Sequence, residues 1–175
     1  IQYTVWPADL HGHRYRVKLH ITKPNPEGQV LQMPAWIPGS YLIRDFSKQI
    51  ESIEAYSIST KKKLPLERID NDQWRLPKVN SAVEIVTTVY AFDSSVRAAH
   101  LDTERGFFNA SSICLGVKGQ ESLPCSLAIA APEGGFTDHW SVQTGLRIVK
   151  TDSRGFGFYL AQNYDDLLDQ PVAFG

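Results

Sequence analysis

Apolar and polar residues alternate along several stretches of this chain, and this alternation predicts β-strands. The clearest stretch is residues 14–22. Its apolar members are Tyr15, Val17, Leu19 and Ile21. A period of two places such side chains on one face of a strand and leaves the other face to water. Residues 125–131 alternate in the same way, and Pro132 ends that pattern.

Other stretches predict strands through less regular patterns. Residues 82–92 are rich in β-branched side chains at both parities, which is typical of a central strand buried on two sides. Between residues 40 and 57 the apolar spacing first fits a helix and then a strand, which favours one helical turn followed by a strand. Shorter strands are expected at residues 29–33, 64–69, 73–76, 141–144 and 157–162.

The number and spacing of these strands predict the fold class. About nine strands separated by turn signals are typical of a sandwich. We therefore expect an all-β fold, a mainly antiparallel β-sandwich with one or two short helical turns. Residues 1–162 form the expected sandwich domain. Residues 163–175 lose the alternation and are interpreted as a connector toward a further domain.

Composition and charge exclude several classes of protein. The chain has 175 residues, 42% of them hydrophobic, which is enough for a buried core. Its 18 Lys and Arg nearly balance 19 Asp and Glu, so no electrostatic footprint for nucleic acid is expected. No apolar run is long enough for a membrane-spanning helix. The pattern leaves both a cytoplasmic and a periplasmic location open.

Two cysteines, Cys114 and Cys125, are too few for a disulfide framework and lack the spacing of a metal site. We expect both to be buried as small apolar residues, with a bridge between neighbouring strands as the alternative. His11 and His13 could share one face of an extended segment, but no third metal ligand is evident from spacing. They are interpreted as exposed histidines at a strand edge, and no metal site is expected.

The densest group of ionisable residues lies between residues 93 and 105. Its members are Asp93, Arg97, His100, Asp102, Glu104 and Arg105. Such a group could do acid–base work, or it could hold a loop through pairs between arginine and carboxylate groups. We favour the structural reading because no nucleophile or metal accompanies the group. The four tryptophans could likewise form a sugar-binding platform, although burial is the commoner role for such residues.

Four sequence blocks carry a resemblance to a known family. The first, PAWIPGSYLIRDF at residues 34–46, reads as a packed corner, with Trp36 expected inside it. The second is YAFDSSVRAAHLD at residues 90–102, and RGFFN follows at residues 105–109. The fourth is NYDDLLDQPV at residues 163–172. Together they resemble the glycyl aminopeptidase family of zinc metallopeptidases, and the resemblance spans nearly all of the chain.

The resemblance implies that this chain is the amino-terminal β-rich domain of such an enzyme. The zinc-binding motif of the family, His-Glu-x-x-His, does not occur in the sequence. No catalytic residue, metal ligand or cofactor is therefore expected here; zinc would be bound by the catalytic domain, which would also take the peptide substrate. Family members often carry a PDZ domain as well. The alternative is a stand-alone β-sandwich module that binds carbohydrate or protein.

The resemblance also suggests where the catalytic domain would dock. We expect residues 93–109 and 164–175 to lie close together, with at least one of their phenylalanine rings exposed. The candidate interface or cleft-lining residues are Arg44, Arg97, Phe107, Phe108, Asn109 and Phe174.

Overall fold

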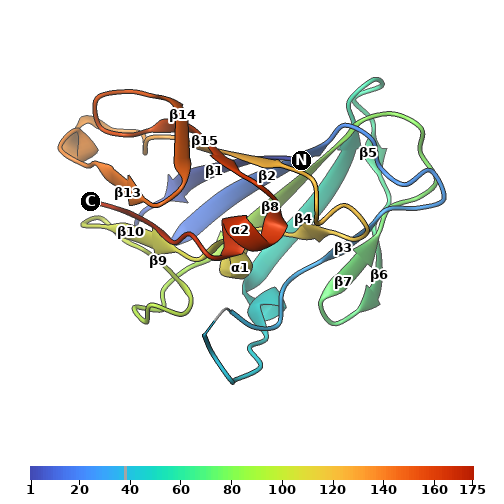
Figure 1. Cartoon of the computed structure of the whole chain (residues 1–175), viewed down its shortest axis with the longest axis horizontal. Coiled ribbons are helices and arrows are strands. Elements are labelled where there is room, and N and C mark those ends of the chain that lie inside the picture. Colours follow the sequence, from blue (N-terminus) through green and yellow to red (C-terminus); the bar gives the residue numbers. More distant parts are fainter. Residues whose placement is uncertain (38) are drawn as a thin grey trace.

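The largest layer of the molecule is an eight-stranded sheet (Figure 1). The structure is a computed structural model that describes residues 1–37 and 39–175. In order across the sheet, the strands are β14 (Arg147–Thr151), β15 (Gly157–Ala161), β12 (Cys125–Ile129), β1 (Gln2–Asp9), β2 (Arg14–Ile21), β8 (Val83–Tyr90), β4 (Ile50–Ser57) and β5 (Lys63–Leu64). Neighbouring strands run antiparallel, except for the parallel pair β1 and β12.

Two four-stranded sheets lie side by side over one face of the large sheet (Figure 1). One contains β13 (Val142–Thr144), β16 (Val172–Phe174), β10 (Gly106–Phe108) and β9 (Ala99–Leu101), in that order. The other contains β11 (Gly116–Val117), β3 (Val30–Gln32), β7 (Gln73–Arg75) and β6 (Glu67–Asp70). The predicted all-β, mainly antiparallel sandwich is therefore confirmed.

Alternation along the strands places the core between these layers. On β2, Tyr15, Val17, Leu19 and Ile21 are all buried, as their spacing predicts. On β8, Ile85 and its like-facing neighbours are buried, but Glu84, Val86 and Thr88 on the opposite face are only half-buried. The prediction that β8 is buried on both sides was wrong, because that second face looks outward from the large sheet.

Tyr15 connects the large sheet to the sheet containing β10 and β16. Its ring meets Phe108 edge-on at 5.5 Å and Phe174 at 6.2 Å, measured between ring centroids. Its hydroxyl donates to the carbonyl of His100 at 3.0 Å. Gly106 permits this close packing, because a Cβ at that position would lie 2.7 Å from the Tyr15 hydroxyl oxygen and would overlap the Phe174 ring.

Short helices join the layers. The 3₁₀-helix η1 (Phe46–Gln49) precedes β4, which confirms the helical turn followed by a strand. The others are α1 (Ala110–Ile113), η2 (Gly135–Thr137) and α2 (Tyr164–Leu168). At the start of α2, the side chain of Asn163 accepts a hydrogen bond from the backbone NH of Asp166 at 2.8 Å, as a helix cap does.

Residues 163–175, interpreted from sequence as a connector, are folded into the sandwich. They form α2 and β16, and β16 lies inside its sheet between β10 and β13. Phe174 is buried beneath Trp140 and Phe156. A strand of three residues is too short to show alternation, so this segment looked irregular in sequence.

Both cysteines are buried and free, as expected for small apolar residues. Burial raises the pKa of both thiols, that of Cys125 to about 11. Among the described residues, no helix is long and apolar enough to cross a membrane.

Candidate docking surface

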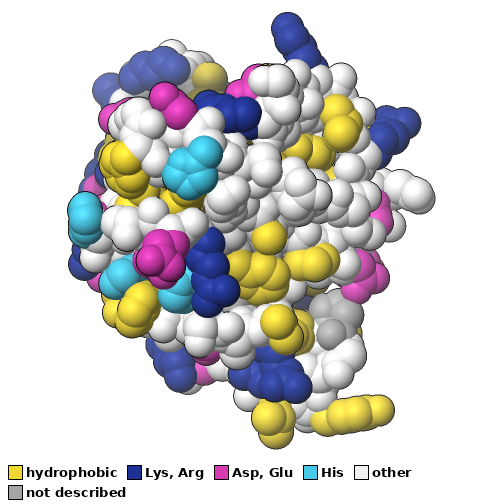
Figure 2. All heavy atoms as spheres, turned by 90° about the vertical axis from the view of Figure 1, so that its left-hand side faces the viewer, with side chains coloured by type: hydrophobic (Ala, Val, Ile, Leu, Met, Phe, Trp, Pro, Cys, Tyr) yellow, Lys and Arg dark blue, Asp and Glu magenta, His cyan; other side chains and the backbone are white. Residues whose placement is uncertain are grey.

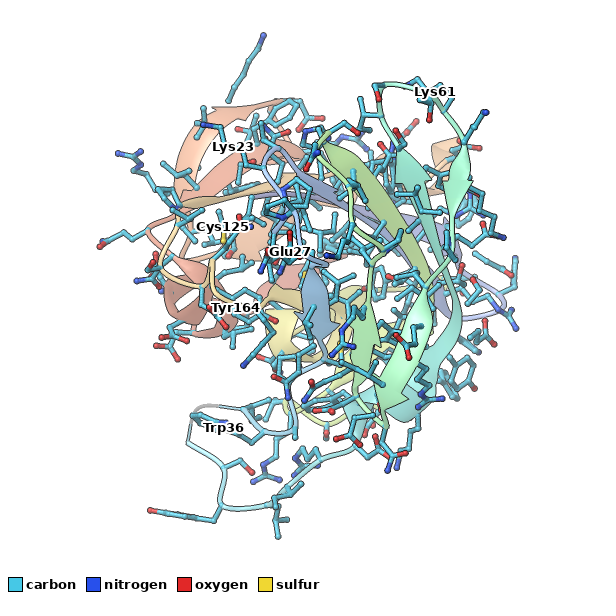
Figure 3. All side chains as sticks on the ribbon, turned by 90° about the vertical axis from the view of Figure 1, so that its right-hand side faces the viewer. Lys23, Glu27, Trp36, Lys61, Cys125 and Tyr164 are labelled. Carbon is cyan, nitrogen blue, oxygen red and sulfur yellow. The ribbon has the colours of Figure 1, made fainter. Side chains whose placement is uncertain are left out.

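The two most exposed large apolar side chains among the described residues, Tyr41 and Ile43, belong to residues 34–46, which we call the corner loop. Trp36 is 57% exposed, Ile43 is 87% exposed, and Tyr41 stands entirely in solvent. Figure 3 shows the loop with Trp36 projecting away from the sandwich. The prediction that Trp36 packs inside a corner was therefore wrong. Pro38, one of the two prolines in that prediction, lies outside the described residues.

The corner loop is attached to the sandwich at both of its ends. Ile37 and Phe46 are buried, and the backbone NH of Arg44 donates to the carbonyl of Ala35. Gly39 has a φ of 76°, a left-handed conformation that glycine adopts without strain. The loop thus extends away from its own core and presents Tyr41, Leu42 and Ile43 outward.

Residues 92–98 form a second loop beside the first, which we call the Phe92 loop. Phe92 and Val96 are largely exposed. The side-chain amide of Asn109 donates to the carbonyl of Val96 at 2.7 Å, and the Asp93 carboxylate accepts from the backbone NH of Ser95 at 2.9 Å. These bonds fix the loop against α1 while leaving its apolar side chains free.

Three hollows border the Phe92 loop. The Arg44 hollow, about 420 Å³, lies between this loop and the corner loop. The Arg97 hollow, about 270 Å³, lies on the other side of the corner loop, next to Asn109. The Phe107 hollow, about 370 Å³, extends from Val96 to the end of β16. We call this continuous surface, from the corner loop to β16, the docking belt.

Most of the sequence-predicted interface residues fall on this belt. Arg44, Arg97, Asn109 and Phe107 each line one of its hollows. The expected proximity of residues 93–109 and 164–175 is confirmed, because Gly106, Phe107 and Phe108 of β10 pair with Phe174, Ala173 and Val172 of β16.

The expectation that at least one of Phe107, Phe108 and Phe174 is substantially exposed was wrong. Phe108 and Phe174 are buried, since both pack against Tyr15 in the core. Phe107 is half-buried, because successive residues of β10 face opposite sides. Phe108 and Phe174 thus pack in the core beneath the docking belt and do not form part of its exposed surface.

Electrostatic contacts in the predicted ionisable group are structural. His100 and Asp102 lie 2.8 Å apart between Nε2 and Oδ2. The other oxygen of Asp102 accepts from the backbone NH groups of Glu104 and Arg105, at 2.8 and 2.9 Å. Desolvation opposes the ionisation of Asp102, but these hydrogen bonds outweigh it and lower its pKa to about 2. The pair therefore closes the turn between β9 and β10.

An aromatic stack joins this pair to the Phe92 loop. The Phe92 ring lies between the imidazoles of His13 and His100, at centroid distances of 3.9 and 5.3 Å. The Nδ1 atom of His13 is 2.6 Å from the carbonyl oxygen of Leu101, so its ring is fixed by the domain itself. Among the described residues, no group of three or more His, Cys, Asp or Glu side chains is placed to hold a metal ion.

A wider hollow, about 860 Å³, lies on the outer face of the large sheet. Lys18 lies over the ring of Trp6 there, at 5.4 Å, and forms an ion pair with Glu84 at 3.2 Å. The charged side chains that line this hollow are thus partly paired with one another. Of the other tryptophans, Trp74 and Trp140 are buried and Trp36 is on the corner loop, so the four do not form one sugar-binding platform.

Sequence reasoning missed the exposed residues Tyr41, Leu42, Ile43 and Phe92 as surface features. A signal was present: Tyr41, Leu42 and Ile43 form a run of three apolar residues in a segment that contains glycine, serine and proline. Such a run in a loop is unusual for a surface facing only water. Figure 2 shows hydrophobic side chains together with Lys and Arg at the lower end of the molecule.

Comparisons with known proteins agree with one another. Residues 2–175 match the profile of the peptidase M61 N-terminal domain. An aminopeptidase N family protein from Idiomarina loihiensis matches with a TM-score of 0.93 and 44% identity over 99% of this chain. Native yeast LTA4 hydrolase shares the fold, with a TM-score of 0.50 and 8% identity over 100% of the chain. The chain spans 29% and 28% of the lengths of these two proteins. No curated protein sequence matches it.

Proposed function

Because this chain belongs to the family of peptidase M61 N-terminal domains, we propose that it is the non-catalytic amino-terminal domain of a zinc metallopeptidase of the glycyl aminopeptidase type. Its role is to support the catalytic domain, which docks on the docking belt. The single observation that carries this proposal is the exposed apolar run at Tyr41, Leu42 and Ile43, next to Phe92 and Val96. Surfaces of this kind mark interaction sites, since water alone does not favour them.

The remaining parts of the proposal follow from the family. The catalytic domain would hold zinc and the peptide substrate, and zinc there would supply the activation of water that hydrolysis needs. We also propose that the full protein carries a PDZ domain after its catalytic domain. Arg44, Arg97, Asn109 and Phe107 contact the catalytic domain or line its cleft. Residues 163–175, which complete this domain with α2 and β16, lead toward the catalytic domain in this proposal.

A matched pair of substitutions tests the docking in the longer protein that contains this domain. Ile43→Asp places a charge on the belt, and Ile148→Asp places the same charge on β14, where Ile148 is 63% exposed. We expect Ile43→Asp to lower the thermal stability of the longer protein and its hydrolysis of glycyl and alanyl anilides, because a buried carboxylate without a partner is unfavourable. Ile148→Asp should leave both unchanged. Equal behaviour of the two variants would argue against docking at the belt.

A further inference from the structure

Among the residues that the structure describes, the guanidinium of Arg44 has no hydrogen-bond or ion-pair partner. Its Nε atom is buried and forms no hydrogen bond. Within residues 1–37 and 39–175, no carboxylate lies within ion-pair distance of its side chain. A buried donor without an acceptor is costly, so the Nε atom of Arg44 is available for a partner from outside the domain.

The two carboxylates that line the Arg44 hollow are occupied elsewhere. Asp45 accepts a hydrogen bond from the hydroxyl of Ser47 at 2.6 Å, and Asp93 accepts from the backbone NH of Ser95. Both bonds belong to tight local turns that hold each carboxylate in place. Lys48 also lines the hollow and adds a second positive charge. The hollow therefore has cations whose charge its own carboxylates do not take up by direct contact.

Apolar side chains surround the hollow. Ile43, Phe92 and Tyr90, the last at the end of β8, form part of its wall. When a second protein surface covers such a ring, water is excluded and a charge pair inside becomes stronger. The same covering would make an unpaired Arg44 far more costly. A covering surface that brings an anion to Arg44 would remove this cost.

We propose that the Arg44 hollow receives an aspartate or glutamate side chain of the domain that follows this one in the full protein. The proposal rests on the proposed function, because it takes the docked catalytic domain as the covering surface. A carboxylate fits best, since the planar guanidinium offers two parallel donors to its two oxygens. The partner lies in the same protein, because the homologous chain from Idiomarina loihiensis is more than three times as long as the region matched here, which covers 29% of it.

A zero-length cross-link tests the pairing in the full protein. Arg44→Lys places a primary amine at the hollow, and a water-soluble carbodiimide joins an amine to a carboxylate in direct contact with it. We expect a cross-linked peptide that connects residue 44 to a sequence beyond residue 175. The unsubstituted protein supplies the background from Lys48, which lines the same hollow. Cross-links confined to Asp45 or Asp93, or no cross-link from residue 44, would overturn the proposal.

Hydrogen exchange separates this proposal from the docking itself. In the full protein, Arg44→Gln should speed exchange of the amides of residues 39–46 at least about tenfold, because truncating one partner of a buried charge pair is strongly unfavourable. Arg16→Gln is the matched control, since Arg16 is exposed on the outer face of the large sheet. If the amides of residues 39–46 still exchange slowly in Arg44→Gln, the corner loop is covered by another domain, but no carboxylate of that domain pairs with Arg44.

Two other outcomes would also reject the proposal. If the corner-loop amides of the unsubstituted full protein exchange as fast as those of the exposed turn at residues 59–62, the corner loop is not covered and the docking fails as well. The cross-linking reaction is also run with a short peptide added. If the amine at residue 44 then cross-links only to the C-terminal carboxylate of that peptide, the hollow binds substrate and not the following domain.

Discussion

Tyr15 and Tyr41 are the same residue type in opposite surroundings. Tyr15 is buried between two sheets, with two aromatic neighbours and a bonded hydroxyl, whereas Tyr41 is entirely exposed on the corner loop. The difference shows that aromatic residues serve two purposes in this chain. One set stabilises the domain itself. The other is exposed to solvent in this domain, and its contact with a following domain is part of the proposed function.

The same division holds for the charged groups of the two regions. Asp102, at the turn between β9 and β10, has three hydrogen-bond donors directed at it. Arg44, on the corner loop, has none of its side-chain donors matched by a carboxylate among the described residues. The charge of Asp102 is therefore matched within the sandwich, whereas that of Arg44 is not matched by a carboxylate of the described residues. The predictions that follow test this division.

The largest effect is expected from Tyr15→Ala. Removing a buried aromatic ring leaves a cavity between the sheets, so the free energy of unfolding should fall by about 3–5 kcal/mol. Tyr41→Ala is the matched control, and it should stay within about 0.5 kcal/mol of the unsubstituted chain. Denaturant unfolding of the 175-residue chain measures both. Similar losses of unfolding free energy for Tyr15→Ala and Tyr41→Ala would contradict the division between core and exposed aromatic residues.

A smaller effect, of up to about 2 kcal/mol, is expected from Asp102→Asn. The pKa of Asp102 is lowered from 3.8 to about 2 in the folded state. The stabilisation is therefore present above the unfolded value, and it is lost as the pH falls through about 2.

The test of this prediction is the difference in unfolding free energy between Asp102→Asn and the unsubstituted chain. It should be constant above about pH 5 and should shrink steadily below pH 4. Asp138→Asn, at a carboxylate whose side chain is 80% exposed, is the control and should give no comparable trend. A difference independent of pH would mean that Asp102 is not stabilised by its ionised form.

The smallest effect is expected from Trp36→Ala in the isolated chain. Because Trp36 is more than half exposed, its loss should cost about 1 kcal/mol or less. Trp74→Ala, at a ring that is 5% exposed, should cost about 3 kcal/mol or more. A loss at Trp36 as large as that at Trp74 would show that the corner loop is packed after all.

Sequence reasoning predicted the parts of the fold that rest on alternation. β2, β8, β12 and the helical turn before β4 were found because long elements repeat their pattern several times. β1, β9, β10, β11, β14 and β16 were missed. Four of these, β9, β10, β11 and β16, have only two or three residues, which cannot show a period. Their strand pairing depends on partners distant in sequence, such as Phe108 opposite Val172.

The predicted interface residues line neighbouring hollows, and their contact with another domain stays a prediction. The resemblance pointed to Arg44, Arg97, Asn109 and Phe107, which do lie on one surface. The sequence placed Trp36 inside because large aromatic side chains are usually buried. That rule assumes that a domain buries its own aromatic residues, and it fails where another domain is expected to cover them.

Hydroxyl-radical footprinting of Trp36 and Tyr41 tests the central claim most directly. The oxidation of each side chain is measured by mass spectrometry in the 175-residue chain and in the longer protein. We predict that both residues react readily in the chain and fall toward the low reactivity of the buried Trp74 in the longer protein. Phe158 on β15, exposed to 54%, should react equally in both. Undiminished oxidation of Trp36 and Tyr41 in the longer protein would contradict the claim that the corner loop is a docking surface.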